Sequence, residues 1–154
     1  MNHCFKSKII NLLFEKNNDI SLDDVKDLIK PVKYVEEYSP KKYIETWKIN
    51  GTNIEHNDND LPSKIKYDSN KKTEYYCNYG KLQKRVVYLN DKLHSINGPA
   101  VIEYHLNFYI KKVSYYFNGK LHRDNCLPAV IIYDDTGEKI SSHYFENGIE
   151  INKN

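Results

Sequence analysis

The chain is poor in cysteine and in long apolar runs, and each shortage excludes a class of protein. Its 154 residues include 3 cysteines, Cys4, Cys77 and Cys126, which are widely spaced and form no CxxC pair. This spacing argues against a disulfide framework or a structural zinc site and predicts reduced thiols. The run IINLLF near the N-terminus is too short for a signal peptide or a membrane span. We therefore expect a cytoplasmic or otherwise intracellular protein without membrane association.

Arginine residues are few, and the net charge is small. Of 23 basic residues only Arg85 and Arg123 are arginines, and the formal net charge is +2. A nucleic-acid binder usually carries a more concentrated positive charge, so this balance argues against one. The preference for Lys, together with many Asn and Ile residues, is typical of an AT-rich genome. It indicates a low-GC bacterium, its phage, a protist or a large DNA virus as the source.

Known catalytic motifs are missing as well. The sequence has no nucleophile elbow, no phosphate-binding P-loop and no Rossmann glycine fingerprint. The adjacent acids Glu36-Glu37 and Asp134-Asp135 would point to opposite faces of a strand or be solvated in a loop. Cys126 has no neighbouring base in the sequence that would activate it. The sequence therefore predicts no enzyme, no catalytic residues and no cofactor.

The first part of the chain differs from the rest. Apolar residues cluster with helical spacing from Cys4 to Glu15, and Ser21 to Asp24 resembles a capping box before a second helix that Pro31 ends. Residues 1–30 are therefore predicted to form a helical cap and residues 31–46 a linker. Residues 47–152 are predicted to form a β-hairpin repeat domain, with the whole chain one compact unit.

The predicted repeat rests on a sequence motif that occurs twice in the chain. NDKLHSINGPAV at 90–101 returns as NGKLHRDNCLPAV at 118–130, and LPSKIKYD and KKTEYYCNYGKL echo LPAVIIYD and KKVSYYFNGKL. The Asn-Gly dipeptides tolerate positive φ at both centres of a tight hairpin turn. They lie at Asn50-Gly51, Asn118-Gly119 and Asn147-Gly148. This pattern predicts a mainly β fold, an antiparallel meander of stacked hairpins.

The recurring His94 and His122 invite a metal hypothesis, which the expected geometry opposes. Equivalent positions in successive hairpins lie about two strands, or roughly 9–10 Å, apart. One zinc ion holds nitrogen ligands at about 2 Å, so the two rings would not share an ion. We assign both histidines a structural role and predict no metal site. Pro99 and Pro128 also recur, at loop edges where a missing N–H does no harm.

Strand alternation sorts the repeat into two predicted faces. One face is apolar and is predicted to be the core: Ala100, Ile102, Tyr104, Val113, Tyr115, Phe117, Ala129, Ile131, Tyr133 and Tyr144. The other face mixes aromatic and polar residues and is a candidate partner-binding surface: Lys72, Tyr76, Lys112, Tyr116, His143 and Phe145. The structural alternative is that these rings only ladder across strands, at about 0.2–1 kcal/mol per pair.

The phrase NGKLHRDNCLPAVIIY, followed by YFENG, resembles the MORN-like β-hairpin repeats. The variants most similar to it are those of giant-virus proteins and of YwqK-type, antitoxin-like bacterial proteins. The chain lacks the regular Tyr-x-Gly and Gly-x-Gly glycines of that family, so lipid binding is not carried over. The resemblance implies an extended, curved sheet that serves as an interaction scaffold.

These observations leave three hypotheses of function. The first is a non-enzymatic protein–protein interaction scaffold, a virion or host-interaction component of a large DNA virus or phage. The second is an antitoxin or immunity protein that neutralises a toxin. The third, single-stranded nucleic-acid binding, rests on the phrase Lys-Lys-x-x-Tyr-Tyr at Lys71–Tyr76 and Lys111–Tyr116. An exposed terminal strand near Ile149–Ile151 also predicts a homo-oligomer.

Overall fold

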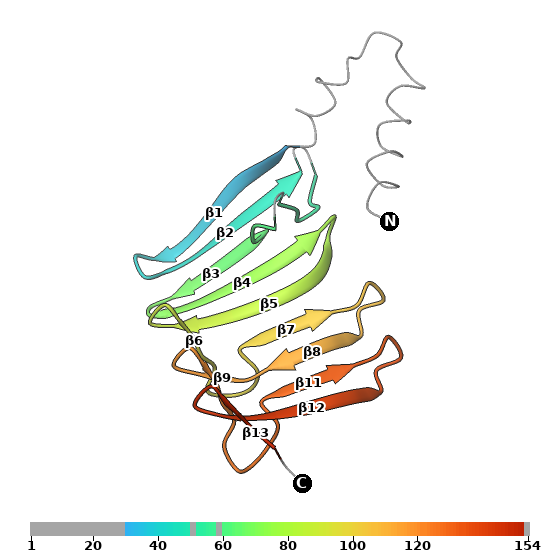
Figure 1. The fold of residues 1–154 in the computed structure, drawn as a ribbon. Helices are drawn as coiled ribbons and strands as arrows, with labels where there is room; N and C mark the ends of the chain where they lie inside the picture. The colour runs from blue at the N-terminus through green and yellow to red at the C-terminus, as the bar shows by residue number, and fades with distance from the viewer. Residues whose placement is uncertain (1–29, 50–51, 58–59, 153–154) are drawn as a thin grey trace.

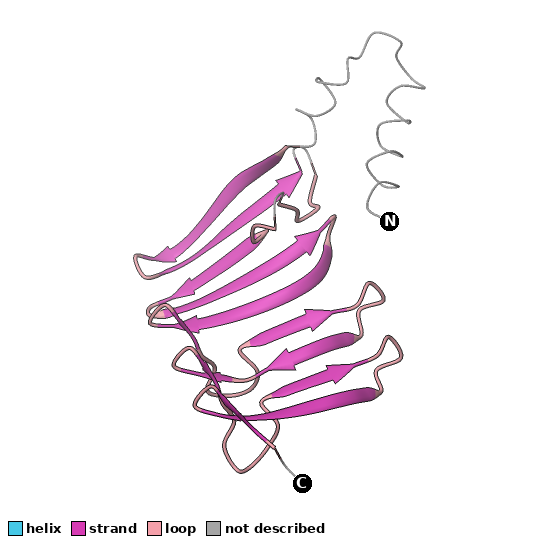
Figure 2. Cartoon of the chain, viewed as in Figure 1, coloured by secondary structure: helices cyan, strands magenta, loops and turns pink. Residues whose placement is uncertain are grey.

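The computed structural model describes residues 30–49, 52–57 and 60–152. The predicted helical cap lies almost wholly outside these residues, as do Cys4 and the turn pair Asn50-Gly51. The described residues contain strands and turns and no helix. The prediction of a mainly β, antiparallel fold is thereby confirmed for this part of the chain (Figure 2).

The strands follow one another along the chain and, for the most part, along the sheet (Figure 1). An 11-stranded sheet has the order β1-β2-β3-β4-β5-β7-β8-β11-β12-β13, with β6 also paired to β5, and β9 and β10 form a two-stranded sheet. The strands are β1 (Pro31–Ser39), β2 (Lys42–Ile49), β3 (Lys64–Asp68), β4 (Lys71–Asn78), β5 (Lys81–Leu89), β6 (Lys92–Leu93), β7 (Val101–Tyr104), β8 (Ile110–Ser114), β9 (Tyr116–Phe117), β10 (Lys120–Leu121), β11 (Val130–Tyr133), β12 (Lys139–Glu146) and β13 (Ile149–Ile151).

The predicted linker over residues 31–46 is wrong. Residues 31–39 form β1, and β2 begins at Lys42, with Tyr34 opposite Thr46 and Glu36 opposite Ile44. Pro31 occupies the first position of an edge strand, where a missing N–H breaks no ladder bond. Pro40 lies in the turn between the strands. The prolines and lysines that suggested a linker therefore mark the ends of a hairpin.

The register defines two faces of the large sheet. We call the first the alanine face: Ala100 and Ala129 are fully buried, and Val87, Ile102, Val113 and Ile131 share their side. We call the second the glutamate face, which carries Glu45, Glu74 and Glu103 together with the buried Ile65, Val86 and Val130. Apolar side chains are thus buried on both faces, although the sequence assigned the core to the alanine face.

A set of hydrogen bonds that we call the turn clamp joins successive hairpins. The Nδ1 atom of His94 accepts a hydrogen bond from the backbone N–H of Asn118 at 3.2 Å. Gly119 N–H donates to Leu93 O at 2.8 Å, and His94 N–H donates to Val87 O at 3.2 Å. Asn118 and Gly119 have φ of 49° and 84°, the conformation expected for this dipeptide. A buried histidine therefore holds the turn of the following hairpin.

The turn clamp recurs at His122 and at His56. The equivalent bonds are Asn147 N to His122 Nδ1 (3.3 Å), Gly148 N to Leu121 O (2.8 Å), Tyr79 N to His56 Nδ1 (3.4 Å) and Gly80 N to Glu55 O (2.9 Å). β5 and β8, which precede His94 and His122, run in the same direction as β12. β2, which precedes His56, runs in the opposite direction, so the His56 clamp lies at the opposite end of the sheet. His56 had no assigned role in the sequence, because its spacing to the turn and its Tyr79-Gly80 partner differ from the other copies.

Candidate functional site

Two of the predicted binding residues, Lys72 and Tyr76, meet around a buried carboxylate. Lys72 Nζ lies 3.0 Å from Glu74 Oε1, and the Tyr76 hydroxyl donates to Glu74 Oε2 at 2.8 Å. Glu74 is only 8% exposed. The Lys72 ammonium also lies 4.4 Å from the centre of the Tyr88 ring. The polar groups of Lys72 and Tyr76 are therefore engaged within the sheet.

The tyrosines of this network hold their protons tightly. Burial, followed by the hydrogen bond to Glu74, raises the pKa of Tyr76. Burial and the Glu74 charge raise the pKa of Tyr88 to about 12, and burial and Glu45 raise the pKa of Tyr67 to about 12. Phenols that remain neutral can donate to a carboxylate, so the network is stable as a set of hydrogen bonds as well as an ion pair.

The other four predicted residues do not join that network. Lys112 pairs with Glu103 at 3.7 Å on the same face, across β7 and β8. Tyr116 belongs to β9, in the separate two-stranded sheet. Phe145 lies opposite Glu150 near the C-terminal edge. His143 is nearby, on β12. The structure thus distributes the six residues over four places instead of gathering them into one site.

His143 is held by a neighbouring acid at the sheet edge. Its Nδ1 atom lies 3.0 Å from Glu150 Oε1, and its Nε2 atom lies 3.4 Å from Ser141 Oγ. The order serine, histidine, acid is that of a proton relay. The His143 and Glu150 side chains are 44% and 53% exposed, so water competes for each of these bonds. The pair ties β13 to β12.

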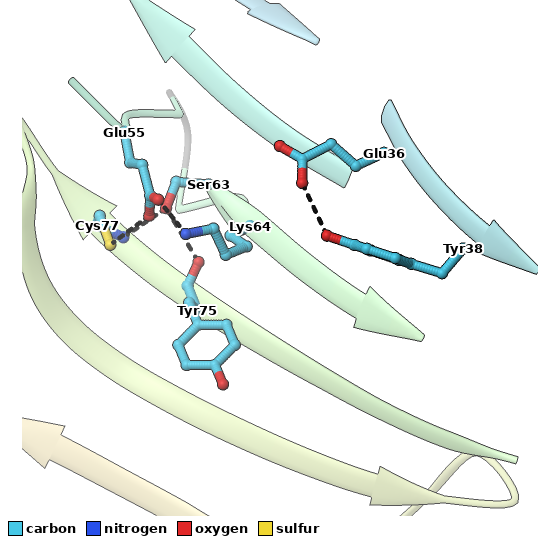
Figure 3. Close-up of polar contacts among 7 residues, drawn as sticks. All are labelled: Glu36, Tyr38, Glu55, Ser63, Lys64, Tyr75 and Cys77. Carbon is cyan, nitrogen blue, oxygen red and sulfur yellow. Dashed lines mark hydrogen bonds and ion pairs between the residues drawn. The ribbon is translucent and has the colours of Figure 1, made fainter. Parts of the chain in front are cut away.

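A second polar cluster, around Ser63, was not predicted from the sequence (Figure 3). The fully buried Ser63 hydroxyl donates to Tyr75 O at 3.1 Å and accepts from Cys77 N–H at 3.0 Å. The Cys77 thiol donates to Glu55 Oε2 at 3.7 Å, and Lys64 Nζ bonds the other oxygen of Glu55. Burial raises the pKa of the Cys77 thiol, which disfavours the thiolate. This cluster ties the residue that precedes β3 to β4 and is a structural element.

Three exposed large apolar side chains lie close together in sequence at the β7–β8 turn. Leu106, Phe108 and Tyr109 are 58%, 61% and 53% exposed, and we call these three residues the apolar tip. Phe108 has a φ of 71°, a left-handed conformation that is strained for a bulky residue. This conformation was not predicted, because the segment LNFY carries no turn dipeptide.

Polar contacts hold the apolar tip in place. Phe108 N–H donates to His105 O at 3.0 Å, and His105 N–H donates to Tyr109 O at 2.9 Å. The turn is also tied to the next hairpin, since Asn107 Nδ2 donates to Asp135 O at 2.6 Å and His105 Nε2 lies 3.1 Å from Tyr133 O. Backbone and side-chain bonds therefore fix a turn whose apolar side chains face solvent.

The described ranges contain neither a metal-binding cluster nor a membrane-spanning helix. Among their residues, no group of three or more His, Cys, Asp or Glu side chains could hold a metal ion. Within the same ranges no helix has the length and apolar character needed to cross a bilayer. Neither described cysteine, Cys77 or Cys126, forms a disulfide.

Comparison with known proteins leaves the family of the chain open. No protein-family model matches the sequence, and no curated protein matches it. Two solved structures have a low similarity to this chain. One is a crystal structure of TarM, with TM-score 0.33 and 12% identity over 97% of this chain and 24% of TarM. The other is a mutant of S. aureus TarM in complex with Fondaparinux, alpha-GlcNAc-glycerol and UDP, with TM-score 0.34 and 11% identity over 95% of this chain and 23% of that chain.

The expectation that the chain is no enzyme is corrected by this comparison. Both similar structures are of TarM, a glycosyltransferase, so the exclusion of catalysis is withdrawn. The chain spans only about a quarter of TarM, and a TM-score this low carries no argument about activity. No reaction is therefore assigned to the chain in place of the withdrawn prediction.

Proposed function

We propose that the chain is a protein-binding scaffold of MORN-like hairpins, and that the apolar tip contacts the partner. The observation that carries the proposal is the tip itself, three large apolar side chains, each more than half exposed, on a hydrogen-bonded turn. A virion or host-interaction component of a large DNA virus or phage is the role that we propose for such a scaffold. Its location would then be the host cytoplasm or the particle.

The physical argument for the tip is the free energy that the fold loses by leaving it exposed. Exposing Leu106, Phe108 and Tyr109 forgoes the stabilisation that burial would give, about 1.5–3 kcal/mol for a fully buried Leu or Phe. The positive φ of Phe108 adds strain of on the order of 1–3 kcal/mol. Aromatic anchors on a preorganised turn are typical of the centre of a protein interface, where burying them against a partner recovers this free energy.

The proposal moves the binding surface away from Lys72 and Tyr76. Those side chains already contact Glu74 and Tyr88, so a partner would have to compete with bonds inside the sheet. The apolar tip faces no such competition, because its exposed groups are mainly side-chain carbons. In this proposal Lys72 and Tyr76 stabilise the sheet through Glu74 and do not contact the partner.

Affinity capture from cells of the source organism tests this function. Tagged full-length chain is compared with Leu106→Ser/Phe108→Ser, and Leu127→Ser/Ile140→Ser is the matched control, since it also removes two exposed apolar side chains. Extracts are treated with nuclease before capture. We expect one near-stoichiometric protein with the wild type and the control, and at least about a tenfold loss with the tip variant.

Two outcomes would contradict the proposal. Equal recovery with the tip variant would place the partner elsewhere on the chain. Recovery that disappears with nuclease would favour single-stranded nucleic-acid binding instead. Thermal unfolding of each variant shows that any loss is not a loss of fold, because the replaced side chains are exposed and contribute little to stability.

A further inference from the structure

A groove crosses the alanine face over β2, β3, β4 and β5. Its first hollow, of about 380 Å³, is lined by Lys42, Lys66, Asp68 and Tyr75 among others. Its second hollow, of about 300 Å³, is lined by Arg85 and by the Ser95–Asn97 loop among others. Lys71, Thr73 and Tyr75 line both hollows, so the two meet there.

The charge of the groove is strongly unbalanced. Lys42, Lys66, Lys71 and Arg85 line it, against the single acid Asp68. Asp68 lies 3.8 Å from Lys42 in an exposed pair and opposite Lys71 in the register. On the neighbouring strand β1, Glu36 accepts the hydrogen bond of the Tyr38 hydroxyl at 3.0 Å. The groove therefore favours an anion, although the chain as a whole is nearly neutral.

Three of the four cationic residues are neighbours of Thr73 in the sheet. In the register Lys66 lies opposite Thr73, and Arg85 lies opposite Tyr75, two residues further along β4. Lys71 lies two residues before Thr73 on the same face. Cross-strand neighbours are about 5 Å apart and alternate residues of a strand about 7 Å apart. Lys66, Lys71 and Arg85 are thus neighbours of the buried Thr73 in the sheet, at distances that long side chains can span.

Arg85 carries a donor that no described residue uses. Its Nε atom is buried and has no hydrogen-bond partner among the described residues. The other arginine, Arg123, lies 3.8 Å from the centre of the Tyr115 ring and donates to Pro128 O at 3.3 Å. A buried donor without a partner destabilises the fold, and a guanidinium matches the geometry of a tetrahedral oxyanion better than an ammonium does.

We infer that the groove binds a ligand through a phosphate or sulfate group seated between Lys66, Lys71 and Arg85 above Thr73. Ser95 and Asn97 line the second hollow and can hydrogen-bond the remainder of the ligand. Tyr75 provides a ring face next to the anion, with Lys66 Nζ 5.4 Å from its centre. The site lies apart from the apolar tip and does not depend on the proposed protein partner.

Two-dimensional ¹H–¹⁵N NMR of the full chain tests this site. Inorganic pyrophosphate and inorganic sulfate are titrated in separate arms at constant ionic strength. We expect saturable shifts at Thr73, Lys71 and the Arg85 Nε–H. Arg85→Gln and Lys71→Gln should each weaken binding about tenfold, as for other charge-assisted hydrogen bonds. The control Lys139→Gln, an equal charge change at an exposed lysine of β12, should leave the Kd within about twofold.

Each outcome decides the inference. If only pyrophosphate saturates the shifts, the ligand carries a phosphate group. If only sulfate does, the ligand is a sulfate ester. If both do, the site recognises the oxyanion chemistry that the two groups share. Shifts that never saturate in either arm would overturn the site, as would an equal effect of Lys139→Gln. Arg85 packs across the sheet, and its replacement could unfold the chain. Lys71 is exposed, so Lys71→Gln tests the site even if Arg85→Gln does not fold.

Discussion

Glu74 is the residue on which the glutamate face depends most. It is buried and bonds both Lys72 and Tyr76. Replacing it with Ala leaves the partly buried Lys72 ammonium without its acid, so we expect Glu74→Ala to lower the free energy of unfolding by about 3 kcal/mol. Urea unfolding at neutral pH measures the change.

Glu103→Ala is the matched control for that substitution. Glu103 also pairs with a lysine on the glutamate face, but its carboxylate and Lys112 are each about a third exposed and lie 3.7 Å apart. Such a pair contributes less than about 1 kcal/mol. If both variants lost equal stability, the Glu74 network would have no special role in the fold.

The tyrosines around Glu74 and Glu45 make stability depend on pH in the alkaline range. The native pKa of Tyr67 and of Tyr88 is raised from 10.0 to about 12. The native state therefore binds these protons more tightly than the unfolded chain does. The stabilisation is complete below pH 10 and is lost as the pH rises through about 12, by on the order of 1 kcal/mol in total after solvent screening.

Tyrosinate absorbance and urea midpoints measured between neutral pH and pH 12 check this dependence. We expect part of the tyrosine absorbance to appear only with unfolding, and the midpoint to fall above pH 10. Tyr88→Phe should reduce the slope of that fall. A titration in which all tyrosines ionise together near pH 10, with no change in stability, would contradict the network.

The structural roles of some individual residues could be predicted from the sequence, and those of others could not, for physical reasons. His94 and His122 were predicted to be structural because equivalent positions are too far apart to share a metal, and both hold turns. The partners of Lys72 and Tyr76 could not be predicted, because strand alternation gives the face of a residue and not its burial. Their shared partner Glu74 is buried, and nothing in the sequence around it indicates that burial.

The turn clamp is the feature that joins one element to the next. His94 is 7% exposed, and its Nδ1 atom accepts the Asn118 N–H. His94→Ala removes the acceptor and leaves a small cavity, so we expect a loss of about 2 kcal/mol in the free energy of unfolding. His143→Ala, which replaces an exposed histidine of β12, should cost less than about 1 kcal/mol. Equal losses for the two variants would contradict a clamp at His94.

Element boundaries were predictable where local chemistry decides them. Asn-Gly and Asn-Asp pairs mark turns because these residues accept positive φ, and Asn118, Asn147 and Asn90 all have it. β1 was missed because its exposed, charged sequence resembles a linker, and only pairing with β2 makes it a strand. The apolar tip was missed because its conformation depends on bonds to the neighbouring hairpin at Asp135 and Tyr133.

Within the described residues the large sheet has two edge strands, one at each end. β1 closes one edge, and β13, with Ile149 71% exposed, closes the other. Unpaired strand edges favour pairing with another chain, so we expect a second copy to associate through β13 at high concentration. Sedimentation velocity should show concentration-dependent dimers that Ile149→Lys removes. A wild type that stays monomeric, or a variant that dimerises equally, would contradict this pairing.

The claim that turn clamps lock the hairpins into one rigid scaffold is tested most directly by amide hydrogen exchange. In an isolated hairpin the turn amides of Gly119 and Gly148 would face water and exchange rapidly. Here they donate to Leu93 O and Leu121 O, so we expect protection comparable with that of Val113 in β8. Exchange of both glycine amides at the rate of an unstructured peptide would mean that the hairpins are not clamped and that the scaffold is not preformed.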